Sequence, residues 1–278
     1  KQMSQEDLGD FEPTVFRKIE SMDDDGNDSY KLKNWVDGFL KIPYDDTEAL
    51  EYTLKNNPNV AGFLVEPIQG EAGVVVPTDG YLSKAAKLCK DKKVLLIADE
   101  IQTGLGRTGK RLACDHENVR PDILILGKAL SGGLIPVSAV LADDEIMLTI
   151  QPGQHGSTYG GNPLACAIAR TALEVIEEEQ MADNATERGI QLREGINKIN
   201  STYIKLVRGK GLLNAIVISH QDTNAAWNLC IEMMKKGLLA KPTHGDKIRL
   251  APPLIINEAQ IQESVSMISK SLKHLELN

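Results

Sequence analysis

The chain has 278 residues, of which 42% are hydrophobic and 25% are charged, and its formal net charge is −8 at pH 7. This composition is ordinary for a globular protein, and the length suits one large domain or two moderate ones. The negative charge argues against a nucleic-acid partner, which would need clustered lysine and arginine, and no apolar run approaches the ~20 residues that cross a membrane.

Residues 1–36 are acidic and lack apolar periodicity, which predicts a solvated, partly disordered segment. A run of aspartates before Gly26 could suggest a calcium-binding loop. With Gly26 as the turn glycine, however, the last ligand position falls on Leu32, and leucine cannot supply the carboxylate that such a loop requires. We therefore expect no calcium site in this segment.

Residues 46–141 show alternating helix and strand patterns. Short apolar runs between turn residues are typical of strands buried on both faces, and apolar residues at helical spacing are typical of helices that cover a sheet. The expected elements are a helix over 46–56, a strand over 60–65, a helix over 80–92 and strands over 94–98, 123–126 and 137–141. Strands joined through a helix run parallel, so we predict an α/β fold centred on a mostly parallel sheet.

The second half of the chain predicts a different organisation. Two long helices are followed by short strands and further helices, which favours a smaller α+β unit. The expected elements are helices over 164–179 and 182–199, strands over 205–207, 213–219 and 247–250, and helices over 225–236 and 258–275.

Two charged residues follow neighbouring strands of the predicted parallel sheet. Asp99 comes directly after the run 94–98, and Lys128 follows the run 123–126. Ligands of open α/β sheets bind at this carboxyl edge. A carboxylate and an amine suit pyridoxal 5'-phosphate, because the lysine can form a Schiff base with its aldehyde while the aspartate keeps its ring nitrogen protonated. The apolar approach to Lys128 further predicts a desolvated amine, which favours the neutral form.

Six ordered motifs resemble those of the class III, fold-type-I aminotransferases that use this cofactor, and among them the ornithine aminotransferases. The resemblance runs from about residue 37 to the end of the chain. It implies part of the large cofactor-binding domain over 37–163, and an interdomain helix with a small C-terminal α+β domain over 164–278. The motifs are VEPIQGEAGVVVP (65–77), ADEIQTGLGRTG (98–109), LGKALSGG (126–133), HGSTYGGNPLA (155–165), RGKGLLNAIVI (208–218) and GLLAKPTHGDKIRLAPPL (237–254).

The resemblance implies a role for each cofactor-binding residue. Lys128 would bind the cofactor covalently and shuttle the proton, and Asp99 would bond the pyridine nitrogen. Gln102 would bond the ring hydroxyl. Ser157 and Thr158 would donate to the phosphate, with Thr158 reaching a neighbouring subunit's cofactor, so the resemblance also implies a homodimer or a larger assembly.

The same resemblance implies the substrates. Arg249 would bind the α-carboxylate of glutamate or 2-oxoglutarate, and Glu71 would pair with Arg249 while ornithine presents its δ-amine, with Glu66 in support. The implied reaction transfers the δ-amino group of ornithine to 2-oxoglutarate, giving glutamate semialdehyde and glutamate. An acetylornithine or 4-aminobutyrate type of ω-amino-acid aminotransferase stays open. So does a catalytically inactive fragment, because we expect the chain to be N-terminally incomplete.

A phosphate-binding P-loop is a competing interpretation of GLGRTGKR at 104–111. Arg111 stands where the Mg²⁺-binding hydroxyl should be, and the acidic pair precedes the glycine loop on the same strand instead of coming from another strand. We therefore expect a turn-rich loop. The four cysteines have no CxxC spacing, which favours reduced thiols and a cytoplasmic or mitochondrial-matrix location. The histidines have no metal-ligand spacing, so no metal site is expected.

Overall fold

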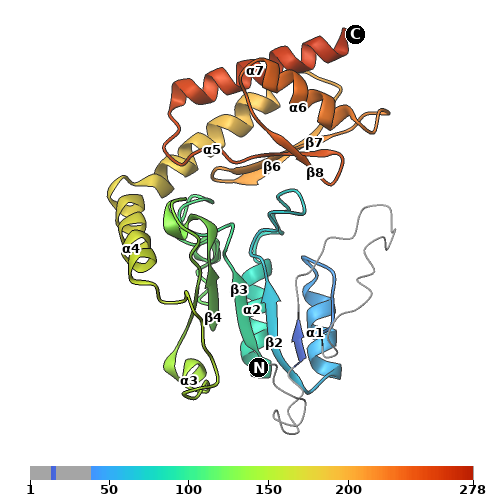
Figure 1. Cartoon of the computed structure of the whole chain (residues 1–278). Helices are drawn as coiled ribbons and strands as arrows, with labels where there is room; N and C mark the ends of the chain where they lie inside the picture. Colours follow the sequence, from blue (N-terminus) through green and yellow to red (C-terminus); the bar gives the residue numbers. More distant parts are fainter. Residues whose placement is uncertain (1–13, 17–38, 278) are drawn as a thin grey trace.

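Two β-sheets organise the part of the chain that the structure, a computed structural model, describes: residues 14–16 and 39–277 (Figure 1). The first sheet has five strands in the order β1-β2-β3-β4-β5, and the second has four in the order β6-β7-β9-β8. Helix α4 (Pro163–Glu178) runs beside the first sheet and leads to α5 (Met181–Asn197), which belongs to the layer of helices over the second sheet.

The first sheet is mostly parallel, as predicted. Its pairs β1–β2, β2–β3 and β3–β4 are parallel, and only β5 runs antiparallel to β4. The segment between β4 and β5 contains only a short 3₁₀ helix, so it does not return the chain for another parallel strand. The strands are β1 (Thr14–Phe16), β2 (Val60–Val65), β3 (Leu95–Asp99), β4 (Ile123–Leu126) and β5 (Ala139–Ala142).

Two helices cover one face of this sheet. Helix α1 (Thr47–Asn56) begins after Asp46, whose carboxylate accepts the backbone N–H of Ala49 at 2.8 Å, and α2 (Tyr81–Lys92) lies next to α1. Alternate residues such as Phe63 and Leu96 point into this layer and are buried. The next residues along, such as Ile97, are only half-buried, so the prediction of burial on both faces is wrong for the described part of the chain.

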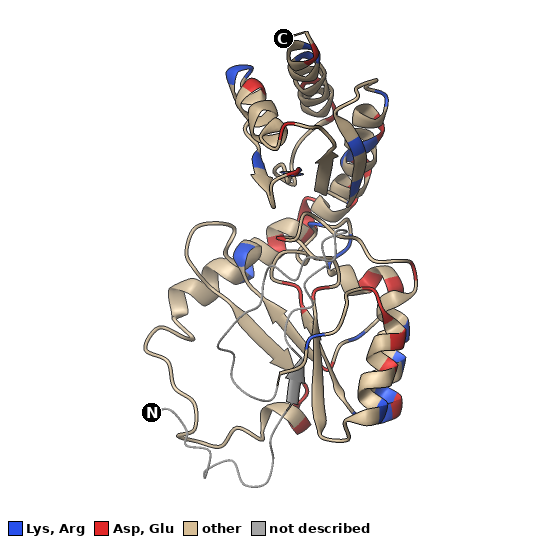
Figure 2. Cartoon of the chain, turned by 90° about the vertical axis from the view of Figure 1, so that its right-hand side faces the viewer, with Lys and Arg blue, Asp and Glu red and all other residues tan. Residues whose placement is uncertain are grey.

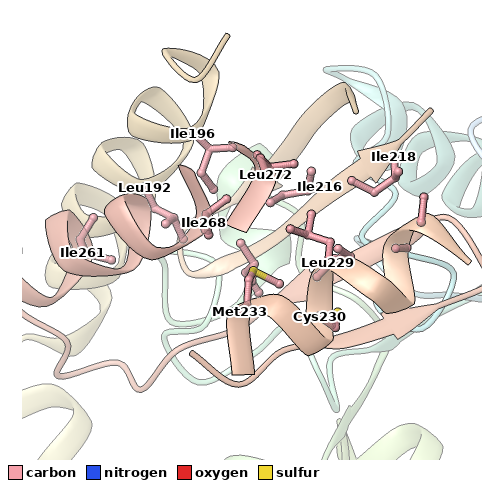
Figure 3. Close-up of a cluster of buried hydrophobic side chains, with 14 of the residues drawn as sticks. Leu192, Ile196, Ile216, Ile218, Leu229, Cys230, Met233, Ile261, Ile268 and Leu272 are labelled. Carbon is pink, nitrogen blue, oxygen red and sulfur yellow. The ribbon is translucent and has the colours of Figure 1, made fainter. Parts of the chain in front are cut away.

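The second sheet is antiparallel throughout. Helices α5, α6 and α7 pack on its face away from the first sheet (Figure 1). The core between them includes Ile216 of β7 (Figure 3) and Ile248 of β9. The opposite face of β7 carries Leu213 and Ala215, which pack against Ile68 and Val74 of the first unit. The elements are β6 (Ile204–Lys210), β7 (Leu213–Ile218), α6 (Ala225–Lys235), β8 (Lys241–Thr243), β9 (Lys247–Leu250) and α7 (Glu258–Glu276).

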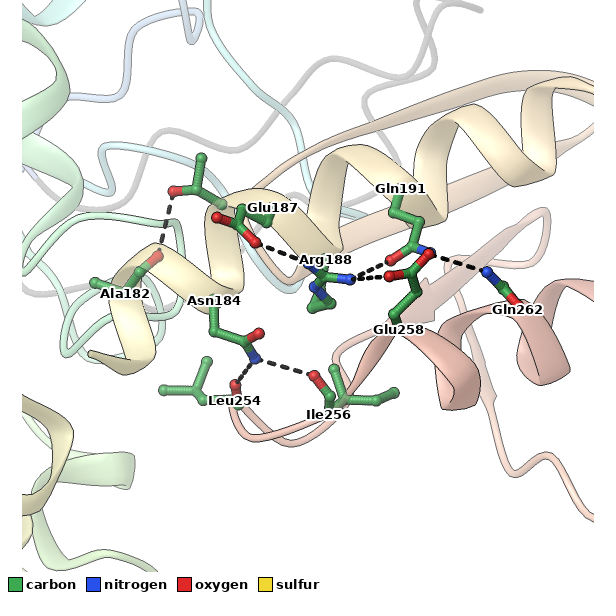
Figure 4. A network of polar contacts seen from close by, with 10 residues as sticks. Ala182, Asn184, Glu187, Arg188, Gln191, Leu254, Ile256, Glu258 and Gln262 are labelled. Atoms are coloured by element: carbon green, nitrogen blue, oxygen red, sulfur yellow. Dashed lines mark hydrogen bonds and ion pairs between the residues drawn. The ribbon is translucent and has the colours of Figure 1, made fainter. Parts of the chain in front are cut away.

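The segment between β9 and α7 is fixed by polar contacts with α5 (Figure 4). The amide nitrogen of Asn184 donates to the backbone oxygens of Leu254 at 2.6 Å and Ile256 at 3.0 Å. The guanidinium of Arg188 lies 3.7 Å from the carboxylate of Glu258, in the first turn of α7. These contacts hold the chain that leaves β9 against the preceding helix.

Two glycines allow close packing where the second unit meets the loop after β3. A Cβ on Gly189 of α5 would lie 1.8 Å from the backbone oxygen of Gly211, and a Cβ on Gly211 would lie 2.3 Å from the backbone carbon of Thr108. The guanidinium of Arg107 donates to the backbone oxygens of Leu212 at 3.1 Å and of residue 252 at 2.6 Å. The loop after β3, the turn before β7 and α5 therefore form one packed junction.

Substituting Gly189 by alanine is expected to destabilise the protein by about 1–3 kcal/mol, because the added methyl meets backbone that cannot rotate away. Gly195→Ala in the same helix is the matched control. Its Cβ would meet Cγ2 of Val265 at 2.8 Å, a side-chain methyl and not backbone, and the gain in helix propensity of up to ~1 kcal/mol opposes that cost. Urea unfolding measures both free energies. Equal changes in the two variants would contradict the packed junction.

Two strands and one α-helix of the described residues were not predicted from the sequence. Strand β1 lies within residues 1–36, which were expected to be a solvated, partly disordered segment, and it adds a parallel strand at the edge of the sheet. Strand β8 and the short helix α3 (Asp144–Met147) were not predicted. The rejected calcium loop lies outside the described residues. None of the helices in the described ranges is long and apolar enough to cross a bilayer.

Charged residues of both signs are interspersed on the helices of both units in the view of Figure 2. Although the net charge is −8, both signs of charge are mixed on these helices, as on an ordinary solvated surface. Among the residues that the structure places, no three His, Cys, Asp or Glu side chains converge as a metal site.

Candidate active site

Three parallel strands deliver the predicted residues to one edge of the first sheet. Asp99 is the last residue of β3 and pairs with Ile125 of β4, three positions before Lys128. Glu66 directly follows β2. Because these strands run parallel, the three charged groups follow the same ends of adjacent strands. The structure thus brings Asp99 and Lys128 to one edge, as the strand-end argument predicts.

Lys128 has an unusual backbone conformation. Its φ is +45°, in the left-handed region, and it begins a 3₁₀ helix (Lys128–Ser131). A non-glycine residue held there costs on the order of 1–3 kcal/mol, a strain that concentrates at functional sites. The side chain is exposed and lines a cavity of about 480 Å³ together with Ser157 and Tyr159. The expected desolvation of the amine is therefore wrong for the described residues.

The adjacent acids Asp99 and Glu100 have different environments. Asp99 is half-buried, and its Oδ1 accepts the backbone N–H of Ile101 at 3.0 Å. Glu100 is buried and accepts the backbone N–H of Cys114 at 2.8 Å and the hydroxyl of Thr103. Glu100 therefore fixes the loop after β3, and Asp99 keeps acceptor capacity for a ligand.

A polar chain joins the second sheet to this edge. Arg249 of β9 donates to Oε1 of Glu71, and the same oxygen accepts the side-chain amide of Gln102 at 3.2 Å. The hydrogen bond from Arg249 is the main cause that lowers the pKa of Glu71, with further contributions from Gln102 and from the positive charge of Lys128. Glu71 therefore stays ionised at neutral pH and within the electrostatic range of Lys128.

Glu66 and Gly70 shape the turn that carries Glu71. Oε2 of Glu66 accepts the backbone N–H of Gly70 at 3.1 Å. A Cβ on Gly70 would lie 1.3 Å from Oε1 of Gln102, so only glycine leaves room for this amide. Glu66 thus contacts the turn that carries Glu71.

The side-chain oxygen of Gln102 is buried and accepts no hydrogen bond from the described residues. A buried acceptor of this kind costs about 1–3 kcal/mol until a donor reaches it. The hydroxyl of a pyridoxal ring is such a donor. The half-buried carboxylate of Asp99 and the accessible amine of Lys128 provide the two other groups that this ring requires. The residues at this edge therefore fit the cofactor predicted from the sequence.

Ser157 and Thr158 lie in an exposed loop before α4. The hydroxyl of Ser157 accepts the backbone N–H of Gly160 at 2.8 Å and lines the Lys128 cavity. Thr158 is exposed and does not line that cavity. The structure thus brings Ser157, but not Thr158, to the predicted lysine.

Sequence reasoning missed two residues that contact the Glu71 turn from the second sheet. The hydroxyl of Thr243 donates to the backbone oxygen of Glu71 at 3.0 Å, and Arg208 donates through two nitrogens to the backbone oxygen of Gly73. Both lie inside the resemblance motifs, but these contacts span 172 and 135 positions of the chain. Local spacing carries no signal for such contacts.

A second, larger cavity of about 720 Å³ lies beside α4. Apolar side chains of α4 and of the segments 129–134 and 254–255 form most of its lining, with Arg107 at its border. None of the predicted catalytic residues lines it. Of the predicted site residues, Lys128 and Ser157 line the smaller cavity.

Cys166, which lines the cavity of Lys128, is expected to be the one fast-reacting thiol of the four. It is exposed, whereas burial raises the pKa of Cys89 to about 12 and of Cys230 to about 11, and also raises the pKa of Cys114. Because the thiolate is the reactive form, a thiol reagent should label one cysteine rapidly in the folded protein and four after denaturation. Cys166→Ser should remove the rapid phase and Cys230→Ser should leave it. Rapid labelling of two or more thiols would contradict the burial seen here.

The chain is similar in sequence to a known family of enzymes. The family profile described as "Aminotransferase class-III" matches residues 30–272. The mitochondrial ornithine aminotransferase of Rattus norvegicus is 63% identical over 238 residues, which cover 86% of this chain and 54% of that protein. Its counterpart in Drosophila melanogaster is 59% identical over the same shares. The chain thus spans about half the length of the curated relatives it matches.

Solved structures share the fold. The acetylornithine aminotransferase of Elizabethkingia anophelis matches with a TM-score of 0.88 and 50% identity, over 97% of this chain and 68% of that one. The ornithine aminotransferase of Toxoplasma gondii, in a crystal with partial occupancy of pyridoxal phosphate, matches with a TM-score of 0.88 and 43% identity, over 95% of this chain and 65% of that one.

Proposed function

The chain belongs to the class III aminotransferases, and from this premise we propose that it transfers the δ-amino group of ornithine to 2-oxoglutarate, giving glutamate semialdehyde and glutamate. The cofactor is pyridoxal 5'-phosphate. Relatives named as ornithine aminotransferases, up to 63% identical, support this choice. An acetylornithine-type activity is the second candidate, because a structure of that name is 50% identical.

The ion pair between Glu71 and Arg249 is the observation that carries the proposal. An α-amino acid would present its carboxylate to a free arginine, but here Glu71 already occupies Arg249. A diamine such as ornithine then enters with its distal amine toward Lys128 and its carboxylate elsewhere. 2-Oxoglutarate brings its own carboxylate, which competes with Glu71 for Arg249, and the bidentate fork of arginine suits that group. One pair therefore serves two substrates in turn.

The other residues have separate tasks. When bound, the cofactor withdraws electrons from the substrate carbon and so makes its proton acidic. Nζ of Lys128 would take that proton and deliver it to the cofactor carbon C4′, two atoms away across the shared nitrogen. Asp99 would hold a proton on the ring nitrogen through a charge-assisted hydrogen bond worth roughly 1.5–3 kcal/mol, or about tenfold or more in rate. The buried side-chain oxygen of Gln102 would accept a hydrogen bond from the ring hydroxyl.

Ser157 and Thr158 support a second part of the proposal, the phosphate site and a homodimer. Both hydroxyls are exposed on the loop before α4, where they can donate to an anion. In this proposal the hydroxyl of Thr158 donates to the cofactor phosphate of a neighbouring subunit. Light scattering of the purified chain at several concentrations tests the assembly, and a monomer at all concentrations would reject it. We place the protein in the mitochondrial matrix or the cytoplasm, with the mitochondrial relatives favouring the former.

Half-reactions on one preparation test the proposed substrate. The purified chain is loaded with pyridoxal phosphate and mixed with ornithine, N-acetylornithine or 4-aminobutyrate, and the change in cofactor absorption is followed. Ornithine should react with the highest kcat/KM. A higher value for N-acetylornithine would select the second candidate, and no change with any donor would reject an aminotransferase activity for this chain.

A further inference from the structure

The second sheet presents one face to the turn that carries Glu71. One cross-strand row runs over this sheet, with one residue from each strand. From β6 through β7 and β9 to β8 its members are Arg208, Ala215, Arg249 and Lys241. Side chains two positions apart on a strand share a face, which places Thr243 on this face as well. The row lies over the first unit, since Ala215 packs there in one apolar cluster with residues 68 and 74.

Four contacts from this face hold the turn over residues 70–73. Arg249 binds the carboxylate of Glu71, and the hydroxyl of Thr243 binds the backbone oxygen of the same residue at 3.0 Å. Nε and Nη2 of Arg208 donate to the backbone oxygen of Gly73 at 3.1 and 3.0 Å. The side chain of Lys247 fills the space beside Gly73, where a Cβ would meet it at 2.3 Å.

Thr243 binds the backbone oxygen of Glu71, whereas Arg249 binds its carboxylate. The side chain of Glu71 is 52% exposed, so solvent competes for its carboxylate and the side chain alone defines its direction weakly. Fixing the backbone oxygen of the same residue restricts where the carboxylate can go. Thr243 and Arg249 lie on paired strands, so the group that fixes the Glu71 backbone and the group that binds its carboxylate move together.

We infer that Thr243 is a positioning residue that sets the Glu71–Arg249 pair, and through it the choice between ω-amine and α-amine donors. This inference rests on the proposed function for its effect on donors. The contact itself stands on the geometry of the second sheet and the turn. Loss of the hydroxyl frees the backbone of Glu71, weakens the pair and leaves Arg249 available to the carboxylate of an α-amino acid.

Thr243→Val tests the inference, with Thr243→Ser as the control that keeps the hydroxyl. Amide hydrogen exchange is read at Gly73 and Val74, whose N–H groups bond the backbone oxygen of Gly70 at 3.2 Å. Loss of one hydrogen bond corresponds to about two- to tenfold faster exchange at these amides. Ile216 in the core of the second sheet should be unchanged in both variants, which separates this effect from general destabilisation. Wild-type exchange in Thr243→Val, or equally fast exchange in the serine variant, overturns the inference.

The second measurement is the ratio of kcat/KM for ornithine to kcat/KM for glutamate as amino donor. Thr243→Val should lower this ratio by about two- to tenfold, and serine should restore it. A faster-exchanging turn with an unchanged ratio would show a structural contact only and would overturn the positioning role. If the wild-type chain reacts with no donor, the proposed function fails, while the exchange comparison still decides whether Thr243 holds the turn.

Discussion

Replacing Lys128 by alanine is expected to abolish transamination, lowering kcat by at least about a thousandfold, toward the upper end of the range for a positioned acid–base group. Among the site residues that the structure describes at this sheet edge, only the amine of Lys128 can both bind the cofactor covalently and carry the proton. Its cavity is open, and its left-handed backbone holds the side chain at the end of β4. The visible absorption of cofactor attached to lysine should be absent from the purified variant.

Lys84→Ala is the matched control for this prediction. Lys84 is an exposed lysine on α2, remote in sequence from the cavity residues. Its removal should leave both the absorption and kcat within about twofold, as expected for a surface substitution away from packed features. Persistent lysine-bound absorption in Lys128→Ala would assign the covalent bond to another residue and remove the central assumption of the site.

Apolar patterns predicted the elements that are long or strongly bounded. The bounds of β2 and β4 agree with the predicted 60–65 and 123–126, and α2 was placed within one residue. Strand β8 has three residues and contains Pro242, so its pairing with β9 comes from tertiary packing more than from propensity. Strand β1 lies in an acidic segment without periodicity, and its pairing with β2 is likewise set by the sheet edge.

The site residues likewise include some that local patterns predict and some that depend on long-range contacts. The strand-end rule was sufficient to predict that Asp99 and Lys128 share an edge, because it depends on short apolar runs within 35 residues of sequence. The pairing of Glu71 with Arg249 spans 178 positions and came from the resemblance, not from any local pattern. Thr243 was not predicted at all. Its importance depends on which face of a strand it occupies, and a three-residue strand gives no readable alternation.

The pH dependence of the Glu71–Arg249 pair follows from the lowered pKa of Glu71. Its folded pKa lies below that of an unfolded glutamate, so the pair is fully formed above the ordinary value of about 4.3 and is lost as pH falls through the folded value. Across the neutral range the pair is therefore constant. Any change in donor choice between about pH 6 and 8 must come from another group.

Arg249→Ala is expected to produce the largest change in substrate use. A hydrogen bond to a charged group contributes about 1.5–3 kcal/mol, so kcat/KM for 2-oxoglutarate should fall by about ten- to 150-fold. Ornithine should lose less than about tenfold, because its carboxylate does not use this arginine in the proposed binding mode. Arg249→Lys keeps the charge without the planar fork. Its kcat/KM for 2-oxoglutarate should lie between those of the wild type and Arg249→Ala.

Two further variants make the substrate argument specific. Arg120→Ala removes an exposed pair with Asp143, at 2.6 Å, and should change neither half-reaction, because such surface pairs contribute about 0–1 kcal/mol. Glu71→Gln should act in the opposite sense to Arg249→Ala, since it frees the arginine and raises the reactivity of glutamate relative to ornithine by about ten- to a hundredfold. Equal losses for both substrates in Arg249→Ala would mean that the arginine only supports the fold. If Arg249→Ala and Glu71→Gln change the relative use of the two substrates in opposite directions, then Glu71 and the oxo acid must bind the same arginine in turn.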